Sequence, residues 1–167
     1  MLQKVSCGTL FTLLFSMVIS GCIALSPVKT EDEFGHRIDG VSDDGRQTIL
    51  ISPPDEAIEY RYFDATFETV SIRPARVSAQ ITEVPVEVLI KGSFPDSCSE
   101  LHKVVQQRAG NIILVTLTMR RPQGAVCASV LRPYRYYLDL DGKYVIGSYS
   151  MKLNETSHPF VVRSTNQ

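Results

Sequence analysis

The 167-residue sequence contains no tryptophan, only three histidines and only four cysteines. It also has no excess of charge of either sign, with 17 lysine and arginine residues against 18 aspartate and glutamate residues. A protein that neutralises nucleic-acid phosphates needs clustered basic residues without compensating acids. The sequence has no such cluster, and we therefore expect no nucleic-acid partner.

Motifs that carry catalytic or cofactor chemistry are also missing. There is no Gly-x-Ser-x-Gly, no His-Glu-x-x-His and no phosphate-binding glycine loop. The histidines stand in no metal-binding or catalytic spacing: His36, His102 and His158. One acidic run lacks the glutamate that closes a calcium-binding loop: Asp39, Asp43 and Asp44. We expect no metal site, no cofactor, no small-molecule substrate and no enzymatic activity.

One weaker enzymatic alternative stays open. Asp96, Ser97 and His102 are residue types that hydrolases use, although their spacing matches no recognised motif.

Long apolar runs are absent except near the N-terminus. The stretch from Leu10 to Ile19 follows a short polar start that contains Lys4. It is shorter than the roughly 20 apolar residues that a membrane-spanning helix needs, and it ends in small residues. We therefore expect residues 1–21 to be a signal peptide.

The junction Ile19-Ser20-Gly21-Cys22 resembles the bacterial lipobox, an aliphatic residue and two small residues before a cysteine that receives lipid. The resemblance implies cleavage before Cys22 and anchoring through acyl chains such as palmitate, each buried methylene contributing roughly 0.8 kcal/mol. The protein would then be a lipoprotein of the cell envelope. Because Ile23 is not the aspartate that retains such proteins at the inner membrane, the outer membrane is favoured. The alternative is an ordinary signal peptide with Cys22 free or disulfide-bonded.

Residues 22–54 have the composition of a tether. They are rich in polar residues, glycine and proline, and such a segment buries too little apolar surface to offset the entropy of ordering. Within it, Gln47 to Ser52 is either an edge strand or part of the linker. We expect the folded domain to occupy residues 55–167.

Short apolar runs separated by turn residues predict an all-β domain. The strongest run places Ile113, Val115, Leu117 and Met119 on one face, and should be a central strand. Leu101 to Gln107 fits a helix or a strand, and we favour the strand. The last two runs predict a hairpin across Asp141-Gly142. The predicted strands cover residues 66–72, 84–92, 111–119, 135–140 and 145–153, which together describe an antiparallel β-sandwich.

Cys98 and Cys127 are the thiols that remain once Cys22 carries lipid. An exported protein meets oxidising conditions, so we expect a disulfide between them. A metal or redox pair is the alternative, but neither cysteine has a nearby histidine or a Cys-x-x-Cys spacing.

The segment Gly92-Ser93-Phe94-Pro95-Asp96-Ser97-Cys98, followed by Cys127 and by Gly147-Ser148-Tyr149, resembles an immunoglobulin-like domain of uncharacterised bacterial envelope lipoproteins. The resemblance covers residues 84–154. It implies paired cysteines and a Gly-x-Tyr segment that ends a hairpin with its ring in the core. The chain departs from antibody-type domains because it has no tryptophan.

A group of arginines and tyrosines is the candidate surface for binding a partner: Arg132, Tyr134, Arg135 and Tyr137. If Tyr136 points inward, alternation exposes Tyr137, and arginine beside tyrosine is typical of binding hot spots. The alternative is that these rings complete the core. A second group, Tyr60 to Phe63, could lie on the same surface.

We expect a non-catalytic, lipid-anchored module that binds another envelope protein. The alternative is an inhibitor of a secreted or periplasmic protease or lysozyme. For that alternative, Leu131-Arg132-Pro133-Tyr134 faintly resembles the Arg-Pro-Trp loop of chagasin-like inhibitors, but the tryptophan is missing.

Overall fold

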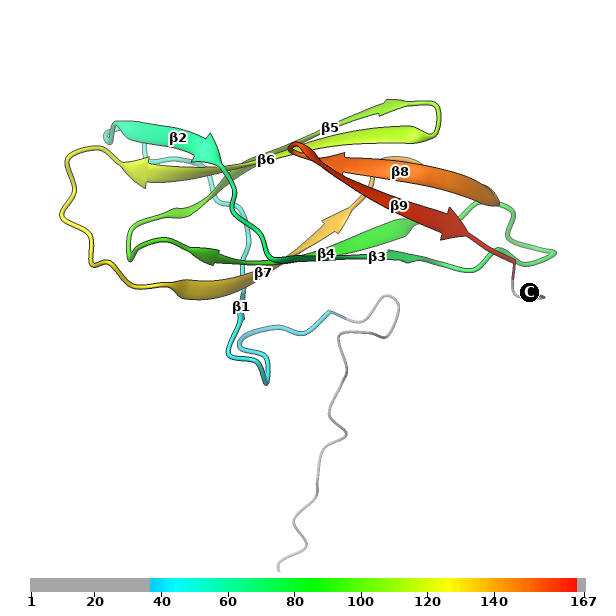
Figure 1. Ribbon diagram of the computed structural model, residues 1–167, viewed down its shortest axis with the longest axis horizontal. Coiled ribbons are helices and arrows are strands. Elements are labelled where there is room, and N and C mark those ends of the chain that lie inside the picture. The colour runs from blue at the N-terminus through cyan, green and yellow to red at the C-terminus, as the bar shows by residue number, and fades with distance from the viewer. Residues whose placement is uncertain (1–36, 165–167) are drawn as a thin grey trace, which may run out of the picture.

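The computed structural model describes residues 37–164, and these form a β-sandwich of two sheets (Figure 1). The all-β prediction is therefore confirmed. The predicted signal peptide, Cys22 and His36 lie outside the described residues. Within residues 37–164, no helix is long and apolar enough to cross a membrane.

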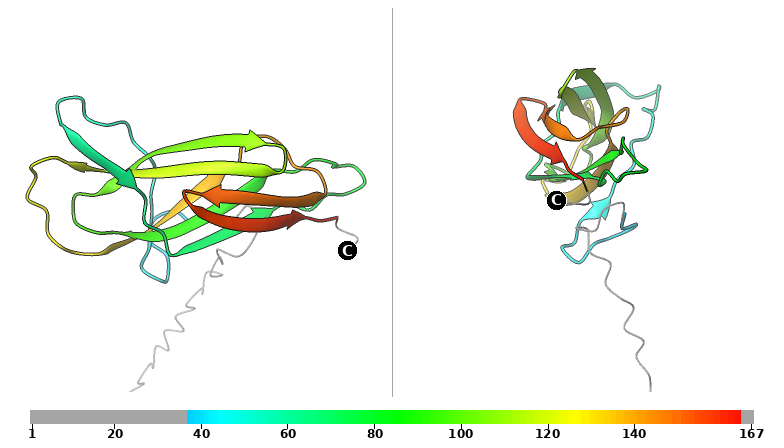
Figure 2. Two further views of the ribbon diagram at one scale, coloured as in Figure 1. Left: turned by 45° about the horizontal axis from the view of Figure 1, so that its top comes forward. Right: turned by 90° about the vertical axis from the view of Figure 1, so that its right-hand side faces the viewer.

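Nine strands between residues 37 and 164 make up the two sheets. In chain order they are β1 (Gln47–Thr48), β2 (Tyr60–Asp64), β3 (Thr69–Pro74), β4 (Val86–Phe94), β5 (Glu100–Ala109), β6 (Ile112–Pro122), β7 (Arg132–Asp139), β8 (Gly147–Leu153) and β9 (Thr156–Val162). The first sheet has the order β1-β7-β4-β3. In the second sheet, β6 pairs along one edge with β5 and along the other with β2 and β8, and β9 lies outside β8 (Figure 2).

The predicted strands are present, but their pairing differs from expectation in two ways. The hairpin predicted across Asp141-Gly142 is wrong, because β7 lies in the first sheet and β8 in the second, where β8 pairs with β9. Two neighbouring pairs, β1 with β7 and β6 with β8, are parallel. The ambiguous segment after Glu100 is a strand, β5, which pairs antiparallel with β6, so the favoured strand is confirmed.

Side-chain alternation places the core between the sheets, as predicted for β4 and β6. Val86, Val88 and Ile90 of β4 are fully buried. The predicted inner face of β6 faces them from the other sheet, and all four of its side chains are buried: Ile113, Val115, Leu117 and Met119. Tyr149 of β8 is also buried and stacks on Phe160 of β9, so the predicted position of its ring in the core is confirmed.

The first strand resolves the open question about residues 47–52. Gln47 and Thr48 pair with Tyr134 and Arg135 at the edge of the first sheet, and the Ile49 amide continues the pairing by donating to the Arg135 carbonyl over 2.9 Å. The ordered sandwich therefore begins well before the predicted boundary at residue 55.

The N-terminal segment, residues 37–48, covers the outward face of the first sheet. The Arg37 guanidinium lies 2.8 Å from the Glu87 carboxylate, and the Ile38 amide donates to the Tyr137 hydroxyl over 3.2 Å. Arg135 is fully buried beneath it and donates to the Thr48 hydroxyl and the Ile38 carbonyl, each over 2.8 Å. The expectation that Tyr137 is exposed is wrong, since only 8% of it is accessible. Because side chains on β7 alternate between its two faces, the Tyr137 ring faces away from the core, and residues 37–48 cover it.

Candidate functional site at the disulfide end

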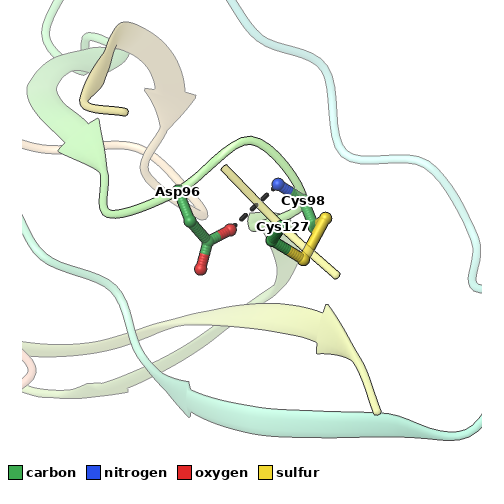
Figure 3. A group of neighbouring side chains, drawn as sticks. All are labelled: Asp96, Cys98 and Cys127. Carbon is green, nitrogen blue, oxygen red and sulfur yellow. Dashed lines mark hydrogen bonds between the residues drawn. A yellow bond between two sulfur atoms is a disulfide. The ribbon is translucent and has the colours of Figure 1, made fainter. Parts of the chain in front are cut away.

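The disulfide ties together two loops at one end of the sandwich. Cys98 follows β4, and Cys127 lies in the loop between β6 and β7, with 5.6 Å between their Cα atoms (Figure 3). The predicted disulfide is therefore confirmed. Because 29 residues separate the cysteines, the bond contributes about 3 to 4 kcal/mol in the chain-entropy model.

Asp96 lies beside the disulfide and organises the turn that leads to Cys98. Its carboxylate accepts a hydrogen bond from the backbone amide of Cys98 over 2.9 Å (Figure 3). It also accepts one from the Ser99 amide over 2.7 Å and lies 3.4 Å from the Arg121 guanidinium. Burial raises the pKa of Asp96, but the hydrogen bonds that its carboxylate accepts and the nearby Arg121 charge together lower that pKa overall. The carboxylate and the two sulfur atoms lie within 4.8 Å of one another. They form no open metal site, because each sulfur is bonded to the other.

The residues of the hydrolase alternative have structural partners of their own. The Ser97 hydroxyl accepts a hydrogen bond from the Ala128 amide over 2.9 Å, and so joins the two loops. The His102 ring packs on the Tyr62 ring with 4.5 Å between centroids, and burial lowers the pKa of His102. Asp96 caps its turn, and none of these contacts joins the three residues to one another.

Arg132, at the start of β7, is the member of the predicted binding group that lies at this end. Its Nε atom donates to the Asp96 carbonyl over 3.1 Å, and its Nη2 atom donates to the Ser99 carbonyl. The guanidinium also lies 4.8 Å from the centroid of the Phe94 ring. These contacts fix the cation in a half-buried position beside the disulfide.

Two adjoining hollows, which we call the Arg132 groove, lie on either side of this arginine. The larger has a volume of about 460 Å³ and reaches Leu50, Ser97 and Glu100. The smaller has a volume of about 250 Å³ and reaches Val41 and Leu131. The hollows share four lining residues: Gln47, Ile49, Phe94 and Arg132. The groove therefore lies between the first strand and the turn that opens β5.

The rim of the Arg132 groove is aliphatic and exposed. Leu50 is 85% accessible, Leu131 71% and Val41 67%. The loop beyond Leu131 continues this character, because Val126 is completely exposed and Val130 is half-exposed. Clustered exposed aliphatic side chains of this kind typically mark a binding surface.

The structure separates the other predicted binding residues from this surface. Tyr134 is fully buried and donates its hydroxyl proton to the Thr66 carbonyl over 2.8 Å. Arg135 and Tyr137 lie under the N-terminal segment. The residues that sequence reasoning missed are Leu50 and Val126. The signal that could have found them is the lack of charge in residues 49–54 and 123–131.

The second aromatic group lies beside the same end of the molecule. Tyr60 pairs with Pro122 and Arg61 with Arg121, at the point where β6 leads into the exposed loop. Tyr62 is half-exposed. The two aromatic groups predicted from sequence therefore have different surroundings, one inside the first sheet and one on the open edge of the second.

Comparison with known proteins supports the β-sandwich. Residues 88–162 match the family model of the ORF11 beta-sandwich domain, which covers less than half of the chain. Over 72 residues, or 43% of this chain, the sequence is 29% identical to two proteins of Herpetosiphon aurantiacus. One is the uncharacterized 10.2 kDa protein in HgiCIIM 5'region, of which 77% is covered, and the other is its counterpart in HgiBIM 5'region, of which 88% is covered. No solved structure matches the chain.

Proposed function

We propose that this protein is a non-catalytic module of the cell envelope that binds another envelope protein in the Arg132 groove. The observation that carries the proposal is a fixed arginine between two hollows with three exposed aliphatic side chains around them. Arginine is enriched in binding hot spots, and clustered exposed apolar side chains mark interaction surfaces. The groove has both features in this structure.

The anchor of this module is a lipid on Cys22, which the lipobox at Ile19-Ser20-Gly21-Cys22 supports. The Cys98–Cys127 disulfide agrees with export, because such bonds persist in oxidising compartments. We place the protein at the outer membrane, since Ile23 is not an inner-membrane retention residue. Mass spectrometry of the N-terminal peptide tests this directly. A thioether-linked lipid on Cys22 supports the anchor, and an unmodified thiol within an intact leader contradicts it.

Site-specific photo-crosslinking tests the groove. A photoreactive residue in place of Leu50 should give one discrete protein adduct in the envelope of living cells. The matched control replaces Ile81, which is also exposed but lies in the loop between β3 and β4. The adduct should disappear when Val41→Asp places a charge on the opposite rim of the groove. Equal crosslinking from both positions, or none from Leu50, would contradict the proposal.

An inhibitor of a secreted or periplasmic enzyme remains the second candidate. Leu131 and Pro133 are the exposed residues of the Leu131-Arg132-Pro133-Tyr134 segment, and they project beside the groove. Inhibition of a protease or lysozyme that is lost on Leu131→Asp would favour this function over envelope assembly.

A further inference from the structure

We propose that the disulfide tip, residues 123–131, inserts its aliphatic side chains into the bilayer that holds the lipid anchor. The inference rests on the proposed lipid on Cys22 and adds an orientation to it. With the tip in the membrane, the Arg132 groove lies at the membrane surface. The partner is then a protein of the same bilayer.

The composition of the tip matches an acyl-chain environment. None of the nine residues from Gln123 to Leu131 is charged, and the adjacent segment 49–54 is uncharged too. Val126, Val130 and Leu131 point into solvent, and the loop is the far extremity of the sandwich at the β2 end (Figure 1). Transfer of such side chains from water to hydrocarbon is favourable, and no ionised group opposes it.

The tip cannot fold back to bury these side chains within the protein. Cys127 is bonded to Cys98, and the Ser97 amide donates to the Ala128 carbonyl over 3.0 Å. In return, the Ala128 amide donates to the Ser97 hydroxyl. These three links hold the middle of the loop against the body, so Val126 stays outside, ready to insert without an ordering cost.

A collar of tyrosine and arginine side chains lies directly behind the tip. Tyr60 and Arg61 pair with the last two residues of β6, and Tyr62 follows them. Arg61 and Tyr62 are exposed, and the Arg121 side chain is 42% accessible. Tyrosine is enriched at the level of lipid headgroups, and arginine extends its charge from there to water. The order along the molecule is thus aliphatic tip, amphipathic collar and polar body.

The charges beside the collar favour zwitterionic lipid over anionic lipid. The turn before β2 carries Asp55, Glu56 and Glu59, and the Glu59 carbonyl accepts a hydrogen bond from the Gln123 amide at the base of the tip. These acids offset the nearby arginines. Contact with the bilayer therefore depends on acyl chains, with no net attraction to negative headgroups.

The anchor keeps the tip close to the membrane. Fourteen residues, 23–36, separate Cys22 from the start of the described chain. At about 3.3 to 3.6 Å per residue they span at most about 50 Å. A tether this short gives the tip a high local concentration at the bilayer. The three aliphatic side chains of the tip therefore suffice for insertion.

The absence of tryptophan makes a direct test possible. Val126→Trp places a single indole on the fully exposed residue of the tip. Ile146→Trp is the matched control, because Ile146 is half-exposed and directly precedes β8, which begins at the opposite end of the sandwich (Figure 1). Each full-length, lipidated variant is placed on vesicles of phosphatidylcholine and phosphatidylethanolamine with brominated acyl chains.

The proposal predicts that V126W emission shifts to shorter wavelength and is quenched by the brominated chains, while I146W emission is unchanged. Replacement of the phosphatidylcholine by phosphatidylglycerol should not strengthen the quenching. Two outcomes overturn the proposal, and they distinguish its own failure from the failure of its premise. If Cys22 carries lipid and the protein sediments with vesicles, unquenched V126W shows that the tip does not enter the bilayer and is free for a protein partner. If the mass of the N-terminal peptide shows no lipid, the anchor itself has failed and the tip proposal fails with it.

Discussion

The packing of Tyr134 of β7 requires a glycine at position 92 of β4. The Tyr134 hydroxyl reaches across Gly92 to donate to the Thr66 carbonyl, and burial raises the pKa of Tyr134, so the proton stays on the oxygen. A Cβ atom on residue 92 would lie 2.4 Å from the Thr66 oxygen and 2.7 Å from the Tyr134 hydroxyl. Only glycine leaves room for this hydrogen bond.

Gly92→Ala should therefore lower the free energy of unfolding by about 3 kcal/mol, through steric overlap in a packed core. Urea denaturation followed by far-UV circular dichroism measures the change. Gly147→Ala is the control, because its added Cβ would lie 3.6 Å from the Tyr149 ring, an ordinary contact distance. Equal stability of the two variants would contradict this account of the β4–β7 contact.

At the same scale, the alternation of apolar residues along a strand predicted correctly which side chains are buried at some positions and not at others. It placed Val88 and Ile90 inside because neighbours on a strand point to opposite faces. The same rule predicts that Tyr137 is exposed. The ring does face away from the core, but residues 37–48 cover it, so the predicted exposure is wrong. The difference arises because the outer face of β7 is covered by a distant part of the chain, and no local pattern contains that information.

At the scale of elements, the N-terminal segment is attached largely through charged contacts. Arg46 lies 2.6 Å from the Glu68 carboxylate and donates to the Gly92 carbonyl over 2.8 Å, and Lys91 lies 3.3 Å from Asp44. Burial raises the pKa of Asp44, but hydrogen bonds from Ser42, Arg46 and Lys91 lower it to about 2. Hydrogen bonds from Ser93 and Arg46 likewise lower the pKa of Glu68.

These two lowered pKa values predict that the segment loosens in acid. A carboxylate with a lowered folded-state pKa stabilises the folded state above its unfolded value near 4, and this contribution is lost as the pH falls toward 2. NMR peak intensities and hydrogen exchange should therefore show fraying of residues 40–48 between about pH 4 and pH 2, while amides of β6 stay protected. Asp44→Asn with Glu68→Gln should produce the same fraying at pH 7. An acid transition in which β6 opens together with the segment would contradict the prediction.

At the scale of the whole molecule, the ordered body begins earlier than composition suggests. The charged and glycine-rich residues after Arg37 have the composition of a linker, yet they cover Leu89 and Tyr137 and supply carbonyl acceptors to the buried Arg135. A chain that starts at Asp55 would leave that arginine buried without those acceptors, or expose it together with apolar surface. Either result costs several kcal/mol.

Two shortened chains test this boundary. A chain of residues 37–167 should melt cooperatively at nearly the temperature of the mature protein, while a chain of residues 55–167 should melt at least 10 °C lower or aggregate. Differential scanning calorimetry at matched concentration measures both. Equal melting temperatures would show that the N-terminal segment is dispensable for stability.

The sequence by itself determined the all-β class, the inward faces of β4 and β6, and the pairing of Cys98 with Cys127. These features follow from period-two alternation and from the number of available thiols, which are local or countable properties. Only the tertiary structure decided that β7 and β8 belong to different sheets, that the N-terminal segment covers Tyr137, and that Arg132 lies in a groove. Sheet partners and covered faces depend on contacts between residues far apart in the chain, and a strand's own pattern is compatible with several of them.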